Sequence, residues 1–212
     1  MTRFDCGDPR SRAEGIAAAA AALESGELAV LPTDTVYGVA ADPASAAAVQ
    51  ALLDAKGRTA ATPPPVLISD AEQLGALVTS VPPAFQRLAD TLWPGGLTLV
   101  LPAADLGWHL GETHGTVALR VPADEVAREL LRRTGPLAVS SANLHGQPSA
   151  CDAAAAQRML GDSVAVYLDG GPTPGGTAST IVAEGADGNI RFIRHGAIPD
   201  ARVLEVAEGA AR

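Results

Sequence analysis

The chain has 212 residues, enough for one α/β domain, and it carries 15 Lys and Arg against 24 Asp and Glu. Because the net charge of −9 repels phosphate backbones, we expect no strong direct binding to nucleic acid. The apolar stretch 16–23 is too short to span a bilayer, and no signal sequence begins at Met1. These features predict a cytoplasmic protein without membrane attachment.

The first predicted element is an Ala-rich helix that follows a polar and loosely held start, residues 1–10. Ser11 and Glu14 have the spacing of a capping box, and Gly26 should follow the end of the helix. Cys6 and Cys151 lie far apart without a metal-ligand pattern, so both should be free thiols.

The remaining predicted elements alternate between strands and helices, and strands predominate near the C-terminus. In chain order, we expect a strand at 28–31, strand or loop at 36–40, a helix at 44–55, a strand at 66–68, helices at 71–78 and 83–92, strands at 97–101 and 116–121, a helix from Pro122 to 133, a strand at 137–139, a helix at 152–160, strands at 164–168, 179–183 and 190–194, and a helix at 200–207. This order predicts one α/β domain with a mixed sheet over residues 1–212.

The usual nucleotide-binding motifs are absent from the sequence. It contains neither a G-x-x-x-x-G-K-[ST] phosphate loop nor a G-x-G-x-x-G after a strand, and its four histidines lack metal-ligand spacing. A nucleotide would therefore bind without the common phosphate loops.

Lys56 is the only lysine in a chain whose other basic side chains are all arginine. With Arg58 it brackets Gly57 at the end of a predicted helix, where two cations could hold a triphosphate. A lysine in the last helical turn is also explained by the helix dipole. Its isolation favours a functional role, and we expect Lys56→Ala to reduce turnover while leaving the fold intact.

Other polar groups follow predicted strands, at positions where ligand sites form in α/β sheets. These are the loop 32–38 with Thr33, Asp34 and Thr35, the segment 140–143 with two serines and Asn143, and the strand-terminal arginines Arg120 and Arg194. Both polar segments are also typical of ordinary turns. Strand alternation places Arg194 on the face of Ile190 and Phe192.

Taken in order, these segments resemble the YrdC family, the catalytic domain of threonylcarbamoyl-adenylate synthases, over about 14–198. The matching landmarks are the loop 32–38, the pair Lys56 and Arg58, Trp93 to Thr98, Leu119 to Pro122, the pair Ser141 and Asn143, Ser179-Thr180, and Arg194-His195-Gly196. Each landmark is weak alone, whereas the ordered set is specific.

The resemblance implies a twisted mixed α/β sheet, parallel and antiparallel, with flanking helices around a concave cavity for ATP and L-threonine. Lys56, Arg58, Ser141, Asn143 and Arg194 would bind ATP, with Lys56 and Arg58 acting in catalysis. Thr35, Arg120 and Ser179 would bind threonine. Three positions depart from the family pattern: Asp34 replaces a common Glu, Leu67 replaces a His found in some members, and His145 replaces a commoner Ser.

The expected reaction combines L-threonine, bicarbonate and ATP to give threonylcarbamoyl-AMP and pyrophosphate. The N-carboxylated amine of threonine would attack the α-phosphorus without a covalent enzyme intermediate. Mg²⁺ would arrive with ATP, held by phosphate oxygens and water. A downstream tRNA threonylcarbamoyl transferase complex would use the product to modify the adenosine next to the anticodon.

Two other functions stay open at this point, and so does the identity of the loop that covers the product. A carbamoyl-adenylate-forming domain would use carbamoyl phosphate on the same fold, and an RNA-binding module would use a basic cavity. Either of two segments, 59–65 or 170–176, could act as the lid.

Overall fold

A computed structural model of the chain describes residues 1–57 and 63–209. Its single sheet has the strand order β1-β8-β2-β3-β7-β4-β6-β5-β9-β10. The strands are β1 (Thr2–Asp5), β2 (Ala29–Leu31), β3 (Gly38–Ala41), β4 (Val66–Leu67), β5 (Leu97–Pro102), β6 (Thr116–Arg120), β7 (Leu137–Ser141), β8 (Val166–Asp169), β9 (Thr180–Glu184) and β10 (Ile190–Arg194). Parallel and antiparallel pairs both occur, which confirms the predicted mixed sheet.

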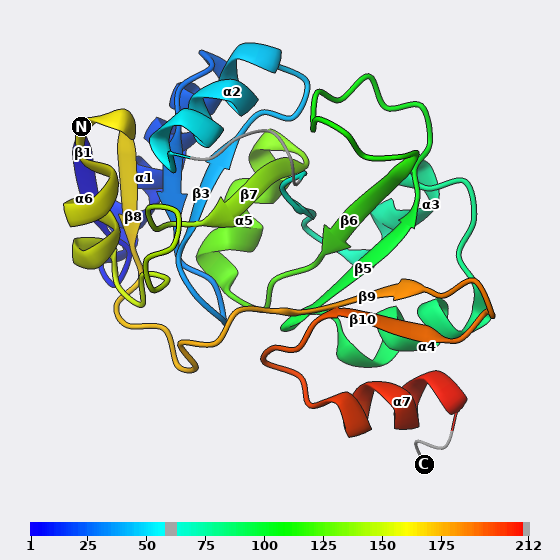
Figure 1. Ribbon diagram of the computed structural model, residues 1–212. Helices are drawn as coiled ribbons and strands as arrows, with labels where there is room; N and C mark the ends of the chain where they lie inside the picture. The colour runs from blue at the N-terminus through cyan, green and yellow to red at the C-terminus, as the bar shows by residue number, and fades with distance from the viewer. Residues whose placement is uncertain (58–62, 210–212) are drawn as a thin grey trace.

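Helices cover the twisted sheet in separate groups (Figure 1). The α-helices are α1 (Pro9–Glu24), α2 (Ala46–Ala55), α3 (Leu74–Leu77), α4 (Pro83–Leu92), α5 (Glu125–Thr134), α6 (Ala153–Leu160) and α7 (Asp200–Glu208), and two 3-10 turns are η1 (Ala71–Gln73) and η2 (Gly161–Ser163). Helices α1 and α5 pack together, and α1 contacts the strands β1, β8 and β2. Helices α4 and α7 pack together near β9 and β10. Within the described residues no helix is both long and apolar enough to cross a membrane.

The alternation of side chains along β5 and β6 separates the core from a cavity on the other side of the sheet. Leu97, Leu99 and Leu101 are buried in the cluster that α4 and α7 cover, whereas Thr98 and Val100 face the cavity. In β6, Leu119 joins the same core and Arg120 faces the cavity. The period of two in the sequence therefore places polar groups inside the fold without placing them in the apolar core.

The N-terminal segment differs from its prediction in two ways. Residues 1–10 are not a loosely held start, because β1 pairs in parallel with β8 over four residues. The helix also begins earlier than predicted, since the Asp8 carboxylate accepts a hydrogen bond of 2.8 Å from the Ser11 backbone N–H. Asp8 is thus the cap, and Pro9 occupies the first helical turn, where its missing N–H costs nothing.

Two further boundaries were placed wrongly from sequence. Pro122 does not open α5, because Asp124 caps this helix by accepting from the N–H of Ala127. The predicted helix 71–78 is divided into the 3-10 turn η1 and the short α3. At α5, the Asp124 side chain offers the first turn an acceptor that determines where the helix begins.

We predict that Asp8→Ala lowers the free energy of unfolding by about 1 kcal/mol, because α1 loses its N-terminal acceptor. The measurement is chemical denaturation followed by circular dichroism. Ser11→Ala is the control, and it should change stability by less than about 0.5 kcal/mol. Equal effects of the two substitutions, or a larger effect at Ser11, would support the predicted capping box of Ser11 and Glu14 instead.

Candidate functional site

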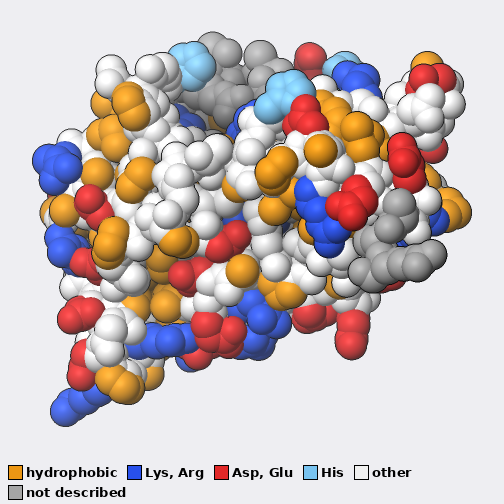
Figure 2. Space-filling model, turned by 90° about the horizontal axis from the view of Figure 1, so that it is seen from below, with side chains coloured by type: hydrophobic (Ala, Val, Ile, Leu, Met, Phe, Trp, Pro, Cys, Tyr) orange, Lys and Arg blue, Asp and Glu red, His pale blue; other side chains and the backbone are white. Residues whose placement is uncertain are grey.

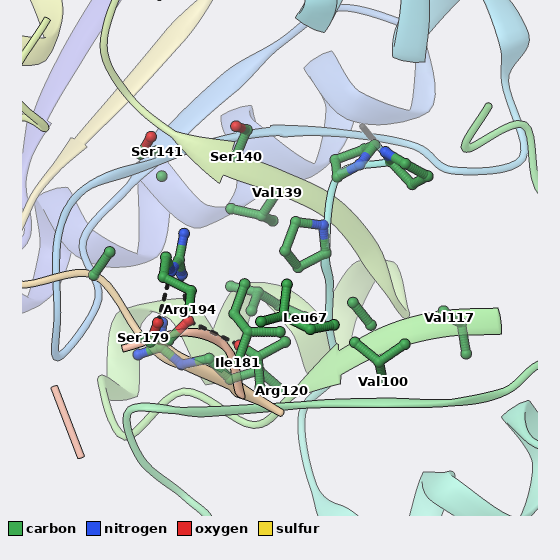
Figure 3. Close-up of a pocket in the computed structure, with 18 of the residues that line it drawn as sticks. Leu67, Val100, Val117, Arg120, Val139, Ser140, Ser141, Ser179, Ile181 and Arg194 are labelled. Atoms are coloured by element: carbon green, nitrogen blue, oxygen red, sulfur yellow. Dashed lines mark hydrogen bonds between the residues drawn. The ribbon is translucent and has the colours of Figure 1, made fainter. Parts of the chain in front are cut away.

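A cavity of about 360 Å³ lies over the central strands β4, β5, β6, β7 and β9. One part of its wall is aliphatic and includes Leu67, Val100, Val139 and Ile181 (Figure 3). Another part is polar, formed by the loop after β2, the end of β7, Ser179 before β9, and the arginines that end β6 and β10. Such a cavity suits a ligand that combines apolar groups with a negative charge.

Arg120 is 5% exposed and is held by groups from two distant segments. Its Nε donates to the carbonyl of Gly95 at 2.9 Å, and its two terminal nitrogens donate to Thr35 Oγ1 at 2.9 Å and Asp34 Oδ1 at 2.7 Å. Burial lowers the pKa of Arg120, and the Asp34 carboxylate opposes that effect. These contacts use three of the five N–H groups of the guanidinium, and two remain for a ligand.

Asp34 reaches Arg120 although it is shorter than the Glu common in the family. The same carboxylate oxygen also accepts from the backbone N–H of Ala123 at 2.8 Å, which ties the loop after β2 to the segment before α5. The Asp34 side chain therefore makes both the ion pair with Arg120 and a hydrogen bond to the backbone.

Arg194 reaches the cavity because β10 contains a bulge. Phe192 pairs with Val182 whereas Arg194 pairs with Ile181, so the register shifts by one residue between them. Sequence alternation wrongly placed Arg194 on the face of Phe192. Phe192 packs against the core, and Arg194 lies with Ile193 on the cavity side.

Ser179 fixes the position of Arg194 through two contacts, drawn in Figure 3. Arg194 Nε donates to the Ser179 carbonyl at 2.8 Å, and a terminal nitrogen donates to Ser179 Oγ at 2.9 Å. Burial lowers the pKa of Arg194, and repulsion from Arg120 lowers it further. No carboxylate lies within ion-pair distance of Arg194 across the two described ranges, so an anionic ligand would relieve this repulsion.

Gly196 is required by the close approach of two chain segments beside Arg194. A Cβ at this position would lie 2.5 Å from the carbonyl carbon of Ser179 and 2.6 Å from its oxygen. Neither backbone atom can move away without displacing Ser179. The glycine of the Arg194-His195-Gly196 landmark thus allows the contact between Arg194 and Ser179.

Lys56 is 3% exposed and organises the end of β7 from behind the cavity wall. Its ammonium donates to the carbonyl of Ser141, to the carbonyl of Asn143 at 2.8 Å and to Oδ1 of Asn143 at 3.3 Å. Among the described residues, the cavity lining includes Ser141 but neither Lys56 nor Asn143. Arg58 lies outside the described residues, as do residues 59–62 of one predicted lid.

The structure therefore brings five of the predicted site residues into one cavity: Thr35, Arg120, Ser141, Ser179 and Arg194. Thr33 and Thr98 were not among the site residues predicted from the sequence. Both line the cavity and contact a predicted site residue. The sequence features that could have indicated them are the alternation of side chains along β5, which places Thr98 on the cavity face, and the spacing of two residues between Thr33 and Thr35.

The thiols offer no activated nucleophile to this cavity. Both cysteines are free, and neither belongs to the described lining. Burial raises the pKa of Cys6 to about 11, so its thiol stays protonated at neutral pH. Within the described ranges no group of three or more His, Cys, Asp and Glu side chains could hold a metal.

The sequence profile of the Sua5/YciO/YrdC family, described as telomere recombination, matches residues 21–196. A Mycobacterium leprae protein named a putative threonylcarbamoyl-AMP synthase is 50% identical over 204 residues, which cover 96% of this chain and 92% of that protein. The Bacillus subtilis threonylcarbamoyl-AMP synthase is 40% identical over 171 residues, which cover 79% of this chain and 49% of the relative.

Solved structures show the same fold. The crystal structure of P. abyssi Sua5 complexed with L-threonine superposes with a TM-score of 0.88 at 31% identity, and the match covers 97% of this chain and 61% of that chain. E. coli YciO gives a TM-score of 0.80 at 21% identity over 95% of this chain and 96% of that chain, a likeness of fold alone.

We predict that Lys56→Met lowers the free energy of unfolding by about 1–3 kcal/mol, because two buried carbonyls lose their donor. The burial of Lys56 thus leads us to expect a loss of stability that the sequence alone did not predict. Chemical denaturation measures the change, and Gln50→Met at an exposed position of α2 is the control, expected within about 0.5 kcal/mol of the parent. A Lys56→Met protein as stable as the control would show that the ammonium is not needed by the fold.

Proposed function

Because the chain belongs to the Sua5/YciO/YrdC family, we propose that it is an L-threonylcarbamoyladenylate synthase. It converts L-threonine, bicarbonate and ATP into threonylcarbamoyl-AMP and pyrophosphate. Two guanidinium groups that line one partly aliphatic cavity, the buried Arg120 and the more exposed Arg194, support this proposal most directly, since the reaction must hold a carboxylate and phosphate groups together.

In the proposed reaction, the amine of threonine takes up carbon dioxide from bicarbonate and forms an N-carboxylate. One oxygen of that carboxylate attacks the α-phosphorus of ATP, and the bond to the bridging oxygen of pyrophosphate breaks. The protein supplies position and charge, without a covalent intermediate. The protonated thiol of Cys6 and its place outside the cavity lining agree with this course.

The roles of the cavity residues follow from their remaining hydrogen-bonding capacity. Arg120, with two unused N–H groups, binds the threonine carboxylate together with Ser179, and Thr35 contacts the same ligand. Arg194 and Ser141 bind phosphate oxygens. Lys56 and Asn143 shape the phosphate side by holding the end of β7. Arg58 acts with Lys56 as a catalytic cation.

Magnesium enters as part of the ATP substrate in this proposal. The cationic part of the cavity has hydroxyl and guanidinium groups, and the described lining contains only one carboxylate, Glu112. Such a wall suits a metal that keeps phosphate oxygens and water as its ligands. The product would pass to the transferase complex that modifies tRNA adenosine next to the anticodon.

The two alternative functions have weaker support. Full-length HypF in a phosphate- and nucleotide-bound form matches with a TM-score of 0.73 over 86% of this chain and 29% of that chain, but at 21% identity it shows the fold alone. For RNA binding, the net charge is −9, and Figure 2 shows basic and acidic side chains interspersed on the face it presents.

We predict pyrophosphate release only when ATP, L-threonine and bicarbonate are all present. Each substrate is withheld in turn, and an enzyme-coupled phosphate assay follows the product. Carbamoyl phosphate in place of threonine and bicarbonate tests the carbamoyl-adenylate alternative. Release that needs no threonine would refute the proposed function, and a gel shift with duplex RNA in the absence of ATP would favour the RNA-binding function.

We further predict that Arg194→Ala lowers kcat/KM by about a hundredfold, because the phosphate side loses a cation. Arg191→Ala is the matched control, since Arg191 lies exposed on the same strand and outside the described cavity lining. It should retain kcat/KM within about twofold. If the two variants behave alike, Arg194 has no part in the reaction.

A further inference from the structure

Thr33, Thr35, Thr98 and Ser179 are four of the hydroxyl side chains that line the cavity, and their proton positions can be deduced from their partners. A hydroxyl donates one proton and accepts through two lone pairs, whereas a guanidinium or a backbone N–H can only donate. A chain of contacts that ends in a fixed donor or acceptor therefore determines which way each proton points.

On one side of the cavity, the contacts make Thr35 an acceptor toward the ligand. The single proton of Thr33 is used on the carbonyl of Val36, at 2.7 Å. In the 3.0 Å contact between Thr33 Oγ1 and Thr35 Oγ1, the proton must therefore come from Thr35. Arg120 donates to Thr35 Oγ1 at 2.9 Å. The proton and one lone pair of Thr35 Oγ1 are then engaged in hydrogen bonds, and its second lone pair can accept from a ligand.

On the other side, the contacts make Ser179 a donor toward the ligand. Arg194 donates to Ser179 Oγ at 2.9 Å, which fills one lone pair. Thr98 Oγ1 lies 2.8 Å from Ser179 Oγ and is fully buried, so no water reaches it. Ser179 Oγ is the one acceptor that Thr98 contacts within the described part of the chain. A proton of Thr98 placed elsewhere would be an unpaired buried donor, which is costly. Thr98 therefore donates, and the proton of Ser179 is left for a ligand.

We propose that Thr33 and Thr98 are positioning residues that give Thr35 and Ser179 opposite hydrogen-bonding polarity. The site then selects a ligand with an N–H donor toward Thr35 and an anionic oxygen toward Ser179, which is the pattern of an amino acid. This inference rests on the proposed function and assigns the amine and the carboxylate of L-threonine to different side chains. A ligand with the reverse polarity would leave a buried group unpaired.

The first test compares Thr98→Val with Thr98→Ser by calorimetric titration of the full chain with L-threonine. Thr98→Val should raise Kd about tenfold, the loss of one hydrogen bond, because the Ser179 proton loses its fixed direction. Thr98→Ser keeps the hydroxyl and should stay within about twofold of the parent. In a Ser179→Ala background, Thr98→Val should change Kd by less than about twofold, since Thr98 acts through Ser179. Equal losses in both backgrounds would overturn the proposal.

The second test separates the two sides with 3-hydroxybutyrate, which is threonine without its amine. Thr33→Val should raise the Kd of L-threonine about tenfold and leave that of 3-hydroxybutyrate within about twofold, because only threonine donates to Thr35. Thr98→Val should weaken both ligands, since both have the carboxylate. Ligand-detected NMR measures the weaker acid. A loss that merely reflects disturbed structure would affect both ligands in both variants, and that result would reject the assigned polarity.

The same variants keep this inference separate from the proposed function. If the parent chain binds pyrophosphate but not L-threonine, the synthase proposal fails. The donor polarity of Ser179 is then tested with pyrophosphate as the probe: Thr98→Val should weaken it and Thr98→Ser should not. Equal pyrophosphate affinity in the two variants would reject the role of Thr98 as well.

Discussion

The site depends on two guanidinium groups that line the same cavity, that of the buried Arg120 and that of the more exposed Arg194. Each repels the other, and burial lowers the pKa of both. Arg120 is neutralised by Asp34, whereas the described contacts of Arg194 are made to the carbonyl and hydroxyl of Ser179. The guanidinium of Arg194 is therefore a local positive charge that an anion can offset, although the chain as a whole has a net charge of −9.

Backbone geometry makes this arrangement possible. The bulge in β10 turns Arg194 toward the cavity and leaves Phe192 in the core, and Gly196 lets the following turn lie against Ser179. A regular strand would direct the side chain of Arg194 into the apolar cluster around α4 and α7. The charge of Arg194 is thus positioned by a local irregularity in the pairing of β10 with β9, whereas β9 pairs regularly with β5 on its other side.

The polar groups of the cavity are connected to the scaffold through pairs in which one member faces the ligand and the other fixes its direction. Thr33 and Thr98 do this for hydroxyls, and Asp34 does it for a guanidinium. Lys56 plays a related part at the end of β7, where its ammonium joins the carbonyls of Ser141 and Asn143. A site built in this way needs little reorganisation when charge develops on its ligand.

The sequence by itself determined the mixed α/β class, most element positions and the ordered landmarks of the family, because periodicity and turn residues act locally. The resemblance to the family also identified Thr35, Arg120, Ser141, Ser179 and Arg194, which the fold gathers from three strands and two loops. Only the tertiary structure decided that Arg194 turns away from Phe192 and that Lys56 is buried behind the cavity wall. Register shifts and hydrogen-bond partners depend on contacts between segments far apart in the chain, and no local pattern records them.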